Sequence, residues 1–488
     1  MNYKRQSVAM LLSSLVASMT AMSQLKLPAF FGNGMVLQRD QPVAVWGQAA
    51  PERDIEISFD GSVARVKSDA EGKWKVNLPS HKAGRSYTLT VKDGRQVVSF
   101  KDVLVGDVWL ASGQSNMEFK MKQAKDKYPA EIAGANNPEI RQFIVKTGYQ
   151  FNGPAGDVGR AEWKAVTPET INDFTAVGYF FAKELYRKYG VPVGIILSSV
   201  GGTPAEAWMS EEGLATFPHY EQEVAAWKDS IKLQQTIAAE AKTQREWYGY
   251  LKQQDSGLAY SSIPWYSEQY QSSDWKLFKL PGFWEEQGMP ETDGVVWFRK
   301  EIDLSPEQAG KQAVLNLGFI SDEDTTYVNG IKAGAVSSRF AGRKYILPDG
   351  LLKAGRNVIV IRVINKWNRG GFMPGKEYDL KTGDNVLSLE GDWLYKPGVL
   401  ARNPLPAATA FQNKPAGLYN GMIAPLIPYA VKGVIWYQGR PTRRRLKNTG
   451  HFFLHWSGTG EASGSRKSFL SCLSNWLIIF RQKRTGRE

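Results

Sequence analysis

The sequence has 488 residues, more than one hydrophobic core usually serves, so it predicts two or three domains. The formal net charge of +13 would suggest a nucleic-acid partner, but its distribution argues against one. Residues 440–488 hold eleven basic and two acidic residues and therefore carry +9 of that charge. The rest of the chain is close to neutral, and we expect no nucleic-acid partner.

The first residues have the pattern of a secretory signal peptide. Lys4 and Arg5 precede a short apolar stretch, and residues 21–23 fit a small-x-small cleavage site. The stretch is shorter than the roughly 20 apolar residues of a membrane span. The only cysteine is Cys472, which excludes a disulfide framework and a lipid-anchored cysteine at the cleavage site. These features predict a periplasmic or secreted protein without a membrane span.

Residues 25–105 alternate in short strand-like segments, such as "PVAVWGQA" and "DIEISF". Gly, Asp and Pro turns separate these segments every eight to twelve residues. This spacing is typical of a small β-sandwich.

From residue 106 the pattern changes to alternating strands and helices. "DVWLASGQSNMEF" is an apolar strand that enters a Gly turn and continues as polar helical sequence. Residues 174–190 have apolar side chains at helical spacing and end in Gly, which predicts a helix. The continuous apolar run in residues 191–202 then predicts a buried parallel strand. This alternation indicates an α/β domain.

Residues 221–247 are polar and predict a further helix, and strand-like sequence resumes at about residue 274. Segments such as "VVWFRKEIDL" and "NVIVIRVINKW", with Gly, Asn and Asp turns between them, predict a second β-sandwich. The α/β pattern returns in residues 419–439. We therefore expect the second sandwich to be inserted into the α/β domain.

Three predicted strands of the α/β domain end in residues that could carry chemistry. Ser115 in "GQSNM" lies where a strand meets a helix, a position that exposes a nucleophile. "SVGGT" at 199–203 has glycines that allow a ligand to approach the backbone, and "WYQG" offers Gln438 as a donor. Two of these motifs also have a simpler structural explanation. Ser115 could cap the start of a helix, and residues 199–203 could form an ordinary turn between a strand and a helix. If the three strands end at the same edge of one sheet, their terminal residues together predict a ligand-binding or active site there.

"GDVWLASGQSNMEF", "GVPVGIILSSVGGTPAEAW" and "KGVIWYQG" together resemble the sialate O-acetylesterase family, a branch of the SGNH-type esterases. "FFGNGMVLQRDQPVAVWGQA" and "WFRKEIDL…TTYVNGIKAG" resemble that family's accessory β domains. The second of these also resembles the sugar-binding sandwich of some β-galactosidases. The resemblance, which spans residues 25–439, implies an SGNH-like α/β esterase domain that a small β-sandwich precedes and a jelly-roll-like β-sandwich interrupts.

The predicted domains are a signal peptide (1–23), an N-terminal β-sandwich (24–105), a first part of the esterase domain (106–270), an inserted galactose-binding-like β-sandwich (271–396), a second, incomplete part of the esterase domain (397–439) and an aberrant basic tail (440–488).

The resemblance implies a serine esterase with Ser115 as its nucleophile. The backbone N–H groups of Ser115 and Gly202 and the side-chain amide of Gln438 would form the oxyanion hole. Gln114 and Asn116 would support it. A Ser-His-acid relay would remove acetyl groups from sugar hydroxyls through an acyl-enzyme, without a metal or another cofactor.

The sequence departs from the family after Gly439. The family motif continues with Glu, and its catalytic base lies farther on in an Asp-x-x-His. Here Arg440 follows, and no Asp occurs after Asp392, so the catalytic His and Asp of the family are not present in this sequence. The motif, the acidic residues and the charge balance are lost at one point, which predicts a reading-frame shift at codon 440. A genuine basic extension is the rival explanation.

The four histidines supply no evident replacement for the base. His81 lies in the first predicted sandwich, and His219 lies near the start of a helix. His451 and His455 have the i, i+4 spacing of a metal pair, but no third ligand is near them in the sequence. An unstructured tail explains this pair better.

The predicted function is an exported carbohydrate esterase that removes O-acetyl groups from sialic acids. One alternative is an acetyl esterase that acts on xylan or another plant glycan, because "GQSNM" and "GGT" would handle the ester and not the sugar ring. Another is a glycan-binding fragment without activity. The sequence leaves open the activity of this particular chain and its oligomeric state.

Overall fold

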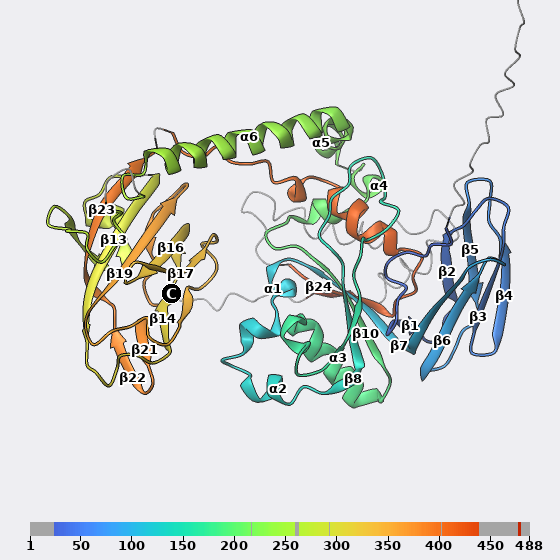
Figure 1. Cartoon of the computed structure of the whole chain (residues 1–488). Helices are drawn as coiled ribbons and strands as arrows, with labels where there is room; N and C mark the ends of the chain where they lie inside the picture. The colour runs from blue at the N-terminus through green and yellow to red at the C-terminus, as the bar shows by residue number, and fades with distance from the viewer. Residues whose placement is uncertain are drawn as a thin grey trace, which may run out of the picture. The chain divides into compact units, whose positions relative to one another are not determined.

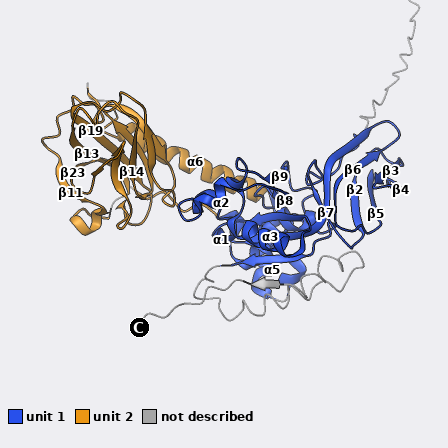
Figure 2. Cartoon of the chain, turned by 90° about the horizontal axis from the view of Figure 1, so that it is seen from below, with its two compact units in different colours: residues 1–230, 410–488 blue, residues 231–409 orange. Residues whose placement is uncertain are grey.

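The computed structural model describes residues 24–215, 217–258, 263–291, 293–401 and 403–438, together with the backbone of strand β25 (Leu477–Ile479). It has two compact units, residues 1–230 with 410–488 (unit 1) and residues 231–409 (unit 2), coloured blue and orange in Figure 2. Both units contain β-sheets, and helices accompany them, so the predicted mixture of α and β structure is confirmed. Within the described residues, no helix has the length and apolarity to span a membrane.

The strands of unit 1 are β1 (Val36–Gln38), β2 (Val43–Gln48), β3 (Asp54–Phe59), β4 (Ser62–Lys67), β5 (Lys73–Leu78), β6 (Gly84–Lys92), β7 (Val97–Gly113), β8 (Asn137–Ile144), β9 (Trp163–Val166), β10 (Val193–Ser199), β24 (Gly433–Tyr437) and β25. Its helices are α1 (Ser115–Glu118), α2 (Pro129–Ala133), α3 (Ala176–Tyr189), α4 (Glu211–Leu214), α5 (Pro218–Lys228), the 3-10 helices η1 (Met121–Ala124), η2 (Ile171–Asp173), η3 (Ala205–Trp208), η5 (Phe411–Asn413) and η7 (Ala424–Leu426), and the π-helix η6 (Tyr419–Ile423).

Strand β7 connects the N-terminal β structure with the α/β part of unit 1 (Figure 1). Its first half pairs antiparallel with β6, and its second half pairs in parallel with β10 on one side and β24 on the other. The predicted domain boundary at residue 105 falls inside this strand of 17 residues. β25, in the basic tail, pairs in parallel with β24.

The central strands of unit 1 are buried on both faces. In β7, Val108 and Leu110 belong to one apolar cluster, whereas Trp109 and Ala111 belong to another. Successive side chains of a strand point to opposite faces, so a continuous apolar run supplies two cores at once. This explains why the sequence here shows no alternation of polar and apolar residues.

Helix α3 and strand β10 confirm the predicted helix–strand unit. The Thr175 hydroxyl accepts a hydrogen bond from the Gly178 N–H, which caps the helix start, and Gly190 ends the helix. The chain then enters β10, which lies between β7 and β8 in the sheet. These elements place the end of β10 beside the end of β7.

Unit 2 contains most of α6 (Ser230–Gln254), the 3-10 helix η4 (Trp284–Gln287) and the strands β11 (Lys276–Leu280), β12 (Gly282–Phe283), β13 (Gly294–Leu304), β14 (Ala313–Leu317), β15 (Ile320–Ser321), β16 (Glu323–Val328), β17 (Ile331–Val336), β18 (Lys344–Leu347), β19 (Gly355–Asn365), β20 (Gly371–Phe372), β21 (Tyr378–Thr382), β22 (Asn385–Ser388) and β23 (Gly391–Leu400).

The strands of unit 2 pair antiparallel, in a sheet of order β11-β23-β13-β19-β16-β17 and in smaller sheets that include β18-β14-β21-β22. In β13, Val296 and Phe298 pack in a core with Leu315 of β14. The alternate residue Trp297 packs on the opposite face with Trp247 of α6. Antiparallel strands whose alternate side chains pack in two apolar clusters agree with the strand-like sequence predicted for this region.

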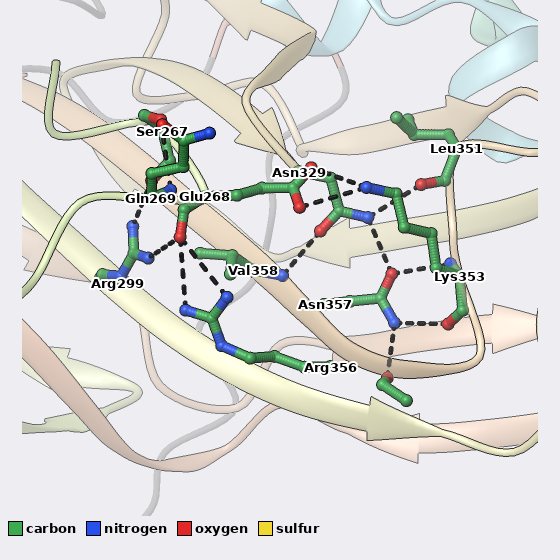
Figure 3. A network of polar contacts seen from close by, with 11 residues as sticks. Ser267, Glu268, Gln269, Arg299, Asn329, Leu351, Lys353, Arg356, Asn357 and Val358 are labelled. Atoms are coloured by element: carbon green, nitrogen blue, oxygen red, sulfur yellow. Dashed lines mark hydrogen bonds and ion pairs between the residues drawn. The ribbon is translucent and has the colours of Figure 1, made fainter. Parts of the chain in front are cut away.

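Two arginines from the adjacent strands β13 and β19 anchor a loop of unit 2 (Figure 3). The fully buried Arg299 donates hydrogen bonds to the carbonyl oxygens of Ser267 (3.0 Å) and Glu268 (3.4 Å). Arg356 also donates to the Glu268 carbonyl at 3.4 Å, and Lys353 pairs with the Glu268 carboxylate at 2.9 Å. Burial lowers the pKa of Arg299 from its ordinary value. The guanidinium groups therefore hold the loop by its backbone.

Asp324 and Arg343 form a buried ion pair in unit 2. Their N–O distance is 2.9 Å, and both side chains are 0% exposed. The Asp324 carboxylate also accepts hydrogen bonds from the hydroxyls of Thr326 (2.8 Å) and Tyr345 (2.7 Å). Burial and this carboxylate raise the pKa of Tyr345.

The substitution Asp324→Asn is expected to lower the free energy of unfolding of unit 2 by about 3–5 kcal/mol, because it leaves the Arg343 charge buried without a counter-charge. Glu286→Gln is the control. Glu286 and Arg369 pair with side chains 58% and 51% exposed, so losing that pair costs about 1 kcal/mol or less. Urea denaturation of the full chain measures both changes, and equal midpoints for the two variants would contradict the prediction.

Candidate active site

The carboxyl ends of three parallel strands meet at one edge of the unit 1 sheet. In the strand register, Gly113 of β7 lies opposite Ser199 of β10 on one side and Tyr437 of β24 on the other. The residues that directly follow these three positions include Gln114, Ser115, Gly201, Gly202 and Gln438. The topology therefore brings the three predicted motifs to one place.

Gly113 allows β7 and β24 to approach closely at this edge. Its φ is +126°, and a Cβ there would lie 2.2 Å from the carbonyl oxygen of Tyr437. That carbonyl accepts a hydrogen bond from the N–H of Gln114 at 2.9 Å. A residue without a side chain is needed where the strand turns into α1.

The substitution Gly113→Ala is expected to destabilise unit 1 by about 3 kcal/mol or more, because it adds backbone strain and a clash with the Tyr437 carbonyl. Gly32→Ala is the matched control, since a Cβ at Gly32 meets no atom within 4 Å. Thermal unfolding followed by circular dichroism measures both. A melting temperature for Gly113→Ala equal to that of the control would contradict the close approach.

Ser115 is exposed at the start of α1 and packs against the glycine turn that follows β10. A Cβ on Gly201 would lie 3.4 Å from the Cβ of Ser115. The Gly201 N–H donates a hydrogen bond of 2.8 Å to the carboxylate of Glu118. Glu118 thus ties the turn to α1. Glu118 was not among the residues predicted from the sequence, although an acidic side chain three positions after Ser115 was a usable signal.

The carbonyl oxygen of Thr203 joins the two glutamines of the site. Gln438 Nε2 donates to it at 3.3 Å, and Gln114 Nε2 donates to the same oxygen. An amide nitrogen carries two hydrogens, and the second hydrogen of Gln438 makes no hydrogen bond among the residues that the structure describes. The Thr203 hydroxyl donates to the Val200 carbonyl (2.7 Å) and accepts from the Trp208 indole (3.0 Å). Thr203, also missed from the sequence, therefore orients both amides.

Backbone donors also lie at this edge. Gly202 has a φ of +78°, and its N–H makes no hydrogen bond within the described residues. The Ser115 N–H lies in the first turn of α1, where N–H groups have no partner in the helix. Asn116 is exposed, and no contact joins its side chain to the other candidate residues in the described part of the chain. The structure thus brings together all the predicted site residues except Asn116.

The segment after α1 is held to the start of α3. Lys120 forms a β-bridge with Thr175, and the ammonium groups of Lys120 and Lys122 each lie 3.2 Å from the Asp173 carboxylate. Hydrogen bonds from these two lysines lower the pKa of Asp173. This half-exposed cluster adds little stability but fixes the path of the chain.

The described residues include two histidines, and neither contacts Ser115. The His81 ring packs edge-on against Phe59 at 4.8 Å, and the exposed His219 ring lies 4.0 Å from the Tyr220 ring. The Ser115 hydroxyl makes no hydrogen bond within the described ranges. In those ranges, no three His, Cys, Asp or Glu side chains are grouped so as to hold a metal ion. Residues 439–476, with His451 and His455, lie outside them.

Comparisons with known proteins link part of the chain to carbohydrate esterases. A family model described as "Carbohydrate esterase, sialic acid-specific acetylesterase" matches residues 105–240. Sialate O-acetylesterase from Homo sapiens is 28% identical over 208 residues, which are 39% of this chain and 39% of that protein. The Mus musculus protein is 29% identical over 207 residues, 39% of this chain and 38% of that protein. The chain thus matches well under half the length of these relatives.

A solved carbohydrate acetylesterase from Xanthomonas citri is 49% identical, with a TM-score of 0.38, over 39% of this chain and 44% of that one. The family match includes Ser115 and Gly202, two of the residues that the strand register brings together, and ends before Gln438. Residues 105–240 of this chain are thus similar to the sialic acid-specific acetylesterases among the carbohydrate esterases.

Proposed function

We propose that this protein is an exported carbohydrate esterase that removes O-acetyl groups from sialic acids, with Ser115 as the nucleophile. The register that aligns Gly113, Ser199 and Tyr437 carries the proposal, because it gathers Ser115 and two kinds of N–H donor at one sheet edge. The names of the relatives favour a sialic acid substrate. Export rests on the signal-like residues 1–23, which the structure does not describe.

In the proposed reaction, Ser115 Oγ attacks the acetyl carbonyl carbon while a base accepts the hydroxyl proton. The Gly202 and Ser115 N–H groups and the second Gln438 hydrogen would face the oxyanion. The sugar hydroxyl leaves with the proton from the base and leaves an acetyl group on Ser115. Water then attacks this ester with help from the same base, and acetate and free Ser115 result.

The base is the missing part of this scheme. We propose that codon 440 carries a reading-frame shift and that the original frame encodes the family's acidic residue and Asp-x-x-His. The SGNH-like fold of the esterase domain and the jelly-roll-like, galactose-binding-like character of the inserted sandwich belong to the same proposal. Their support is the resemblance over residues 25–439.

Acetate release from O-acetylated N-acetylneuraminic acid by the frame-restored chain tests the activity and the substrate. Acetate release from acetylated xylo-oligosaccharides is measured in parallel, as the comparison substrate. Faster release from the sialic acid is expected. Release from the xylo-oligosaccharides alone would show a plant-glycan esterase, and release from neither would favour a glycan-binding protein.

A further inference from the structure

The turn that follows β10 has two adjacent glycines at its centre, Gly201 and Gly202. Glycine has more backbone freedom than any other residue, so this segment does not fix its own conformation. The ends of the turn are held. The N–H of Val200 donates to the Gly113 carbonyl at 3.1 Å, and the Thr203 hydroxyl donates to the Val200 carbonyl at 2.7 Å. The middle of the turn therefore needs an anchor of its own if the Gly202 N–H is to keep one direction.

The side chain of Glu118 holds the middle of this turn. Its Oε2 accepts a hydrogen bond of 2.8 Å from the Gly201 N–H. A hydrogen bond to a carboxylate is stronger than one between two neutral groups. A Cβ on Gly201 would lie 3.1 Å from the same oxygen and 3.4 Å from the Cβ of Ser115. One point of the turn thus lies against both the serine and the carboxylate of α1.

The backbone that carries Glu118 is fixed on both sides by the start of α3. The Met117 carbonyl accepts a hydrogen bond from the Thr175 hydroxyl at 2.6 Å, and the Phe119 carbonyl accepts one from the Ala176 N–H at 2.8 Å. The Met117 side chain is buried in the core between them. Glu118 is itself exposed, but its support is rigid, as a group that orients a functional site requires.

We propose that Glu118 is a positioning residue, which holds the Gly201–Gly202 turn so that the Gly202 N–H faces the oxyanion formed at Ser115. Donors stabilise an oxyanion most when they point at it before the reaction begins. Without the carboxylate, the glycine turn would have to become ordered during the reaction. The inference rests on the proposed function and deepens it, because it explains how one donor of the oxyanion hole is kept in place.

Kinetics of the frame-restored chain with p-nitrophenyl acetate test this role. Glu118→Ala is expected to lower kcat about 10–100-fold and to change KM less than about threefold, because the oxyanion exists only in the transition state and intermediate. Glu118→Gln should keep kcat within about threefold of the parent, since its amide oxygen can accept the same hydrogen bond. Asp126→Ala, at an exposed acidic residue without a hydrogen bond to the turn in the described part of the chain, is the control.

Three kinetic outcomes would overturn the proposal: an unchanged kcat in Glu118→Ala, a loss that appears only in KM, or a Glu118→Gln variant as slow as Glu118→Ala. A Glu118→Ala chain that no longer folds would also overturn it, because a merely structural role would then explain the lost activity. Parent activity no higher than that of Ser115→Ala would instead overturn the proposed function.

Hydrogen–deuterium exchange of the 488-residue chain tests the anchor without any turnover. The peptide that contains residues 200–203 is expected to exchange at least about threefold faster in Glu118→Ala than in the parent, because local opening of the turn becomes easier. Glu118→Gln and Asp126→Ala should exchange like the parent, and all melting temperatures should agree. Equal exchange in Glu118→Ala and the parent would show that Glu118 does not hold the turn.

Discussion

The chain with its reading frame restored after residue 439 is expected to hydrolyse p-nitrophenyl acetate at least about 10³-fold faster than the 488-residue chain. The physical reason is the base. A serine hydroxyl is a weak nucleophile at neutral pH unless a neighbouring group accepts its proton. No Asp occurs after Asp392, so the 488-residue chain cannot supply the family's Asp-x-x-His.

The nucleotide sequence is the first control for this prediction. Translation in another frame past Gly439 should give an acidic residue at once and an Asp-x-x-His farther on. The absence of that motif from every frame would contradict the frame shift. Equal turnover by the two chains would show that the base is a residue outside the expected motif.

Ser115→Ala in the frame-restored chain is expected to reduce kcat by at least about 10³-fold, because the acyl-enzyme can no longer form. Its melting temperature should not change, because Ser115 is exposed and its hydroxyl makes no hydrogen bond in the described part of the chain. Ser80→Ala, at another exposed serine, is the control and should keep full activity. If the Ser115→Ala variant still hydrolyses the substrate at the rate of the unmutated chain, Ser115 is not the nucleophile.

The elements around the site were predictable where local sequence determines them. The apolar spacing and terminal Gly190 predicted α3, and the uninterrupted apolar run predicted β10, because a strand with two buried faces needs no polar residues. Local pattern did not show that β7 continues from the N-terminal strands into the parallel sheet. Its partners change from β6 to β10 and β24, and pairing partners are a tertiary property.

The residues of the candidate site also fall into those that local sequence predicts and those that only tertiary contacts reveal. Ser115 and Gln438 were found because each follows an apolar strand at a turn. The Glu118 contact with Gly201 and the role of the Thr203 carbonyl were not found. These contacts join segments far apart in the sequence, and only the strand register brings them together.

Covalent trapping tests the central claim most directly. The frame-restored chain would be treated with a fluorophosphonate, a reagent that reacts with activated serines, and the modified peptide identified by mass spectrometry. The account predicts one modification, on Ser115, together with complete loss of acetate release and protection by an O-acetylated sugar. Loss of activity with the modification on another residue, and Ser115 unmodified, would contradict it.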